Sequence, residues 1–190
     1  FTVKVHGKAS HAGFAPQDGV HAIRIAAAAI AEMAIGRIGD DTTVNVGQIE
    51  GGRASNIVPD YCEVSGELRS FSHEKALEEL AKVEQIFAKE AEKRGGSIEF
   101  IRDICYQAYK TDEKESVVKE FQKACTACGI KSSLIATFGG SDQNKMSEHG
   151  IPGIVMASAM HQVHSCQEYT EVSEMAQVAG IVSELLQMKE

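Results

Sequence analysis

Apolar and polar residues alternate along several stretches of the first half of the chain, which is the pattern of half-buried strands. Two other stretches place apolar residues three and four positions apart or pack them densely with small side chains, as helices on a sheet do. The expected strands are residues 1–5, 42–49, 61–68 and 97–105, and the expected helices are residues 20–35 and 72–94. The resulting order, βαββαβ, predicts a ferredoxin-like split-βαβ sandwich.

Local signals support the expected helix ends. The stretch 13–19 holds Pro16, Gln17 and Asp18 and can cap the first helix. Ser72 precedes the second helix, and Glu74 places a negative charge near its start, where the helix dipole favours it. Gly95 and Gly96 end this helix.

The second half of the chain alternates helices with short apolar runs. Its expected elements are a helix over 113–128, a strand over 131–136, a Gly139-Gly140 turn, a short helix ending at Gly150, a buried strand over 154–156 and a closing helix over 172–186. This alternation argues for part of an α/β sheet. Two strands are too few for an independent sheet domain. The sequence therefore predicts an α+β chain with a complete domain over 1–108 and an incomplete α/β segment over 109–190.

Composition excludes two classes of partner. The net charge of −8 and a pI near 5.4 repel phosphate backbones, so nucleic-acid binding is not expected. No apolar run approaches the ~20 residues that span a bilayer, so membrane insertion is not expected either. Five cysteines at irregular spacing indicate reduced thiols and a cytoplasmic location.

The chain opens at Phe1, within the first expected strand. We therefore expect it to be part of a longer protein. A targeting signal would then lie ahead of Phe1, so the location rests on cysteine usage.

His11 lies just past a strand end in Gly-Lys-Ala-Ser-His-Ala-Gly, where small neighbours allow a ligand or another backbone to approach. The functional interpretation is a histidine at a ligand or partner contact, and the structural alternative is a histidine that ties down a loop by hydrogen bonds. Asn56 ends a glycine-containing loop and Arg69 lies on the following strand. Both could face an anionic substrate, because arginine offers a planar fork that fits a carboxylate. A turn-stabilising asparagine and a surface arginine are the alternative.

His164 belongs to a polar cluster that follows a buried strand, where ligand sites of α/β proteins lie. A neutral imidazole is a good zinc ligand, and Glu168 could orient it or its surroundings. One ligand does not make a metal site, so a loop histidine remains the alternative.

Two further motifs carry weaker signals. Gly139 and Gly140 precede a helix and could present backbone amides to an anion, or could simply form a turn and a cap. Cys125 and Cys128 have the spacing of a redox or zinc motif but lie near the end of an amphipathic helix without a second pair, which favours packing.

Several phrases, in order across nearly the whole chain, resemble the di-zinc exopeptidases and deacylases, and most closely the peptidase T-like enzymes. The phrases are VHGKASHAG at 5–13, GGRASNIVP at 51–59, ELRS at 67–70, GGSD at 139–142, GIP at 150–152 and HSCQEY at 164–169. Together they are far more specific than any one alone.

The resemblance implies that residues 1–108 are the family's lid, through which two subunits form a homodimer, and that 109–190 are the C-terminal segment of the catalytic domain. It implies two zinc ions and a small peptide or acyl-amino-acid substrate. His11 would donate to the oxyanion in the partner's active site, Asn56 and Arg69 would hold the substrate's polar end together with the Gly139-Gly140 turn, and His164 would be the last zinc ligand.

The family's upstream ligands and its general-base glutamate have no matching positions here, so the resemblance also implies that the chain alone is inactive. Phe138 stands where some relatives carry an arginine, which leaves aminopeptidase, carboxypeptidase and deacylase activities open. The competing hypothesis is a non-catalytic homodimerisation or small-ligand-binding module.

Overall fold

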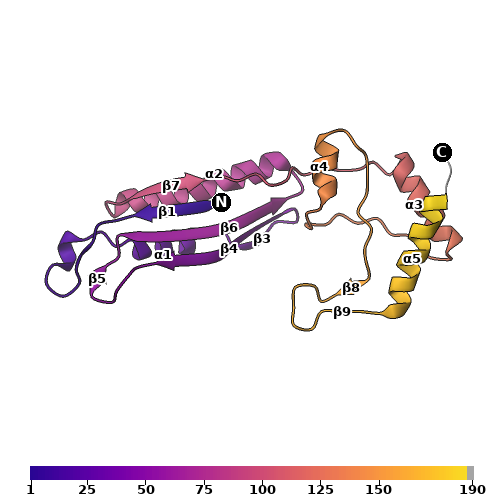
Figure 1. Ribbon diagram of the computed structural model, residues 1–190. Helices are drawn as coiled ribbons and strands as arrows, with labels where there is room; N and C mark the ends of the chain where they lie inside the picture. The colour runs from indigo at the N-terminus through magenta and orange to yellow at the C-terminus, as the bar shows by residue number, and fades with distance from the viewer. Residues whose placement is uncertain (188–190) are drawn as a thin grey trace. The chain divides into compact units, whose positions relative to one another are not determined.

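A computed structural model describes residues 1–187 and divides the chain into two compact units, Phe1–Ala108 and Tyr109–Glu190. Figure 1 shows the elements of both units. Each unit is described by itself below.

The first unit is built on a five-stranded antiparallel sheet in the order β3-β4-β6-β1-β7. The strands are β1 (Thr2–His6), β3 (Gly36–Ile38), β4 (Thr42–Gly51), β6 (Tyr61–Ser70) and β7 (Ser97–Ile101). Two helices, α1 (Ala22–Glu32) and α2 (His73–Lys93), connect them. Without β3, the order is that of the split-βαβ sandwich, so the predicted fold is confirmed for this unit.

Strand alternation directs one face of the sheet to a single core. Val3 and Val5 of β1 are fully buried and pair with Val64 and Cys62 of β6. These side chains pack with α1 and α2 in one cluster, where Phe87 is the largest buried side chain. Because both helices share this core, the sheet carries them on the same face (Figure 1).

The opposite face of the sheet is polar. Lys4 Nζ lies 3.3 Å from Glu99 Oε1 of the neighbouring strand β7. The Tyr61 hydroxyl donates to the carboxylate of Glu63, two positions further along β6. This hydrogen bond raises the pKa of Tyr61 to about 12. The alternation therefore separates a core face from a solvated face, as antiparallel sheets commonly do.

Capping side chains begin both helices. His21 Nδ1 accepts from the Arg24 N–H at 3.2 Å at the start of α1, and Ser72 Oγ accepts from the Lys75 N–H at 3.4 Å at the start of α2. The sequence predicted the Ser72 cap. It did not predict the histidine cap, since His is not among the preferred N-cap residues.

Glu90 is a buried carboxylate near the end of α2, 1% exposed, and it pairs with Arg94 and Lys93. Burial opposes its ionisation, but the two cations outweigh burial and lower its pKa. The helix therefore keeps a charged pair in its last turns, where cations also complement the helix dipole.

The second unit has little regular structure beyond its helices. It contains α3 (Ser116–Ala127), α4 (Asp142–Glu148) and α5 (Val172–Gln187), with the short strands β8 (Met160–His161) and β9 (Tyr169–Thr170). Helices α3 and α5 pack through a small core of Ala124, Cys125 and Ile181, with Cys128 against it. The Cys125-Cys128 pair thus takes part in packing, as expected.

The two strands expected over 131–136 and 154–156 do not form. Both are irregular segments in the part of the chain that the structure describes. The apolar runs were interpreted correctly as non-helical, but a strand also needs a hydrogen-bonded neighbour, and neither run pairs with another described segment. The prediction of strands here is therefore wrong for this chain.

All five cysteines are free thiols. Burial raises the pKa of Cys62 and of Cys125, which makes these thiols less nucleophilic, whereas Cys105 and Cys166 are exposed. None of the helices in residues 1–187 is long and apolar enough to cross a bilayer.

Candidate functional site

His11 lies on a two-stranded ladder of its own at one end of the first unit. Strand β2 (Ser10–His11) pairs with β5 (Ile57–Val58), with His11 opposite Ile57. The Ala12 N–H extends this pairing by donating to the Asn56 carbonyl at 3.0 Å. The ladder brings His11 and Asn56 together from distant parts of the sequence.

Two backbone amides fix the orientation of the His11 ring. The N–H groups of Gly13 and Phe14 donate to His11 Nδ1 at 3.1 and 3.2 Å. Since Nδ1 is an acceptor, a neutral imidazole here carries its proton on Nε2. The Phe14 ring stacks on His11 with centroids 4.3 Å apart. His11 is therefore an exposed, preoriented hydrogen-bond donor.

Close backbone approaches hold the segment that carries His11, residues 8–20, which we call the His11 loop. Lys8 and Val20 bond to each other through both N–H groups at 2.9 Å. A Cβ at Gly7 would lie 2.0 Å from the Val20 carbonyl oxygen, and one at Gly19 would lie 2.4 Å from Ser10 Oγ. At Gly7 only glycine fits, because the contact is with backbone, whereas at Gly19 a larger residue would have to displace the Ser10 and Val58 side chains.

The Asn56 loop is also pinned. Arg53 Nη2 binds both carboxylate oxygens of Asp60 at 2.8 and 2.7 Å, which lowers the pKa of Asp60. Asn56 is exposed, and its side-chain amide bonds to no other residue within 1–187. The amide is thus available to a ligand beside His11.

Arg69 is not part of this group. It lies near the far end of β6, eight positions beyond Tyr61, which at ~3.4 Å per residue is roughly 27 Å away along the strand. There its Nε and Nη2 bind Glu67 at 2.8 and 2.9 Å. The structure therefore brings Asn56 to His11 but does not bring Arg69 to them.

His164 lies in a strained loop of the second unit, residues 162–168, which we call the His164 loop. Its φ is +65°, and Ala159 and Gln162 also adopt positive φ, at +60° and +51°. Non-glycine residues in this region cost energy and persist only when surrounding contacts hold them. Such strain commonly accompanies functional loops.

Specific contacts hold the His164 loop. The Glu168 carboxylate accepts from the His164 backbone N–H at 2.7 Å, so it orients the backbone rather than the ring. At the loop base, His161 Nε2 lies 2.6 Å from Glu174 Oε2 of α5, and its ring stacks on Tyr169 with centroids 4.9 Å apart. The sequence offered no signal for the His161 and Glu174 pair, which lie thirteen positions apart.

The residues described do not by themselves fit a metal centre. In residues 1–187, no three His, Cys, Asp or Glu side chains gather closely enough to hold an ion. A catalytic zinc usually takes three protein ligands. His164 can therefore supply at most part of such a site.

The Gly139-Gly140 turn leads into α4, and local hydrogen bonds engage two of the backbone amides at this turn. The Gly139 N–H donates to Thr137 Oγ1 at 3.2 Å, and the Ser141 N–H donates to Asn144 Oδ1 at 3.0 Å. Local hydrogen bonds thus account for two of the amides in this turn.

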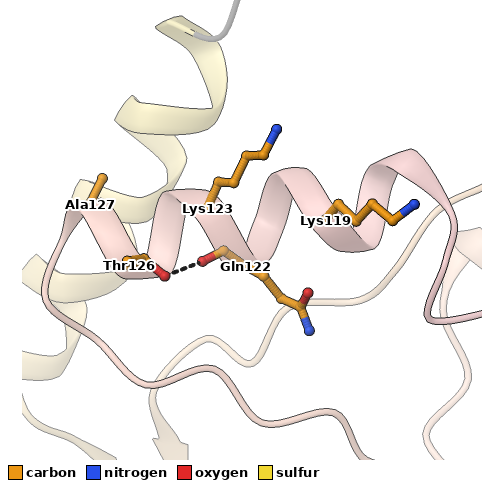
Figure 2. A pocket seen from close by; sticks show the side chains of 5 residues that line it. All are labelled: Lys119, Gln122, Lys123, Thr126 and Ala127. Carbon is orange, nitrogen blue, oxygen red and sulfur yellow. Dashed lines mark hydrogen bonds between the residues drawn. The ribbon is translucent and has the colours of Figure 1, made fainter.

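A shallow hollow along α3 offers no alternative catalytic site. Figure 2 shows Lys119 and Lys123 extending away from the helix, and Thr126 donating to the Gln122 carbonyl at 2.8 Å. None of its lining residues is a carboxylate, histidine or cysteine. This hollow therefore lacks the side chains that commonly serve as general bases or metal ligands.

Residues 1–95, which include the His11 loop and the Asn56 loop, match the M20 family model described as the peptidase dimerisation domain. This is half of the 190 residues. The chain belongs to the M20 peptidase family. Its predicted family resemblance is therefore confirmed, and the five-stranded unit is the family's dimerisation domain.

Similar proteins match over nearly the whole chain. The chain is 35% identical over 183 residues to an uncharacterized Bacillus subtilis (strain 168) protein, YqjE, covering 96% of this chain and 49% of that protein. It is 36% identical to the aminopeptidase PepT of Bacillus cereus ATCC 10987, with a TM-score of 0.82, covering 98% and 51% of the two chains. It is 31% identical to a Staphylococcus aureus subsp. aureus mu50 tripeptidase, with a TM-score of 0.89, covering 98% and 50%.

The M20 chain thus spans about half the length of these relatives. A more distant Bacillus subtilis structure, YXEP, is described as a dinuclear metal-binding peptidase of the M20 family, and at 16% identity with a TM-score of 0.66 it shares the fold. The matching dimerisation domain indicates self-association, and the family is one of metallopeptidases.

Proposed function

We propose that this chain is the dimerisation domain and C-terminal catalytic segment of a metal-dependent exopeptidase of the peptidase T-like type, which hydrolyses small peptides. The observation that best supports the proposal is the His11 ring. Its Nδ1 accepts two backbone N–H groups, so the neutral ring of this exposed residue carries its proton on Nε2, where it can donate to a ligand. A preoriented donor of this kind stabilises the oxyanion that forms on a scissile carbonyl.

In this proposal each candidate residue has one role. His11 donates to the oxyanion across the subunit pair, and Asn56 binds the polar end of the substrate beside it. Arg69, Gly139 and Gly140 are further candidates for the substrate's polar groups. His164 contributes one ligand to a pair of zinc ions, whose remaining ligands come from outside the described residues, so the chain alone is inactive. We also propose a cytoplasmic location, from its free thiols.

The test uses the complete reading frame that encodes this chain, expressed and assayed with di- and tripeptides. His164→Ala is expected to lower kcat/KM by at least about 100-fold and to reduce the bound metal measured by mass spectrometry, since removal even of an outer partner costs ~10–100-fold. His149→Ala, at the exposed C-cap of α4, is the matched control and should retain both. Unchanged metal content and activity in His164→Ala would favour the non-catalytic binding module.

Self-association gives a second prediction, and α1 is the surface we propose for it. Its exposed Ala27 and Ala31 lie four positions apart on one face, which also carries Arg24, whereas the exposed face of α2 is rich in Glu and Lys. Helix α1 also lies over the part of the sheet that ends at the edge strand β3. Small side chains and an open strand edge allow two copies to approach closely.

Light scattering of the 190-residue chain should therefore give twice its mass of 20.5 kDa. Ala27→Glu together with Ala31→Glu should shift the chain to the monomer, because both copies would place like charges in contact. Ala88→Glu, on the exposed face of α2, should leave the dimer intact. A monomeric mass for the unchanged chain at high concentration would contradict the prediction.

A further inference from the structure

Phe14 lies beside the proposed donor and has no assigned role. Its side chain is 87% exposed, the largest fraction among the large apolar side chains of residues 1–187. It lies at the tip of the His11 loop, between β2 and the short 3-10 helix η1 (Pro16–Asp18). An exposed phenyl ring beside a hydrogen-bond donor offers a large apolar contact area to a ligand.

Two interactions join Phe14 to His11. The Phe14 backbone N–H donates to His11 Nδ1 at 3.2 Å, and the two rings stack with centroids 4.3 Å apart and planes 27° apart. One face of the phenyl ring is thus occupied by the imidazole, and the other face is open. Any carbonyl that accepts from His11 Nε2 must therefore lie close to this ring.

The surroundings of Phe14 are apolar and small. Its sequence neighbours are Ala12, Gly13, Ala15 and Pro16, and the nearest charged residue in the loop is Asp18. This stretch of the His11 loop thus offers dispersion contacts to a substrate side chain.

We propose that Phe14 is a specificity-determining residue, whose ring contacts the side chain of the substrate residue next to the scissile bond and favours apolar residues there. The proposal rests on the role of His11 given above. It follows from the shared geometry: the Phe14 ring stacks on the imidazole that carries the donor, so a substrate that engages one also meets the other.

The experiment compares Phe14→Ala with the unchanged protein, both in the complete reading frame. The substrates are Leu-Gly-Gly and Gly-Gly-Leu, each measured against Gly-Gly-Gly. The unchanged protein should hydrolyse one of the two leucine peptides with a higher kcat/KM than the other. For that peptide, Phe14→Ala should lower kcat/KM about tenfold, the size expected from losing apolar pocket contacts. The value for Gly-Gly-Gly should change less than about twofold.

Matched variants exclude a general effect. Phe14→Leu keeps an apolar side chain and should retain most of the preference, and all variants keep the backbone N–H that orients His11. Phe71→Ala removes a half-exposed phenyl ring at the opposite end of β6 and should leave the ratio of the two peptides unchanged.

An unchanged kcat/KM ratio of leucine to glycine peptides would overturn the proposal, whether both values stay the same, both fall equally, or the dimer dissociates. The last would make Phe14 a subunit contact. His11→Ala separates this failure from that of the proposed function. If His11→Ala loses activity while Phe14→Ala leaves the ratio unchanged, only the specificity role is wrong.

Discussion

Replacement of His11 by alanine should lower kcat for peptide hydrolysis by roughly 10²–10³-fold in the complete reading frame, the loss expected for one oxyanion donor. The fold itself should persist, because the His11 ring is exposed and its partners are backbone amides of the same turn. KM should change much less, since the donor acts mainly on charge that develops in the transition state. Steady-state kinetics with a tripeptide measure both.

A second histidine provides the control for this prediction. His21→Asn removes an exposed imidazole from the same unit, while asparagine keeps the capping interaction at the start of α1. Its kcat should stay within about twofold of the unchanged protein. A His11→Ala enzyme that kept its full rate, with this control also active, would exclude His11 from catalysis.

The largest effect on stability is expected from Gly7→Ala. The new Cβ would lie 2.0 Å from the Val20 carbonyl oxygen and 3.2 Å from the Ala22 N atom, and backbone atoms cannot move aside as a side chain can. If the Val20 carbonyl moved away from the new Cβ, the backbone hydrogen bonds between Lys8 and Val20, which hold the His11 loop, would break. We expect a loss of about 3 kcal/mol, at the upper end for overpacked sites. The melting temperature of the first unit should then fall by roughly 12 °C or more.

Gly47→Ala is the matched control for that substitution. Gly47 lies at the β-bulge of β4, and a Cβ there would meet nothing closer than 3.7 Å. Its unfolding temperature should change by no more than about 4 °C. Similar melting of the Gly7 and Gly47 variants would show that the close approach at Gly7 is relieved without cost.

The regular elements of the first unit could be predicted because each carries its own periodic signal. Periodic apolar positions predict which side of each element faces the core, as with Val3 and Val5 in β1 and with Leu80, Val83 and Phe87 in α2. Strands β2, β3 and β5 carry no such signal, being two or three residues long. Their pairing depends on distant residues, which a local pattern does not encode.

The second unit shows the limit of the same reasoning. The apolar run Ile154-Val155-Met156 has the composition of a buried strand, yet it is irregular, because a strand exists only through hydrogen bonds to a neighbour. The three helices were predicted within a few residues, since their backbone bonds are internal.

The candidate site was predictable in its residues more than in its geometry. His11 and Asn56 lie in glycine-containing loops, and small neighbours suggested that something approaches them. The sequence could not show that two amides bind Nδ1, or that Arg69 lies far along β6. The only sequence signal for Phe14 is that it is an apolar residue in the turn-rich stretch 13–19.

The three left-handed residues around His164 have a consequence for transfer of this loop to another protein. Ala159, Gln162 and His164 do not favour that conformation on their own, so Glu168, Glu174 and the ring of Tyr169 must impose it. A short peptide with the same sequence, or a graft without α5, would adopt other backbone conformations. The orientation of the His164 imidazole would then change. The smallest segment that can be transferred with this loop conformation therefore contains the β8–β9 hairpin together with α5.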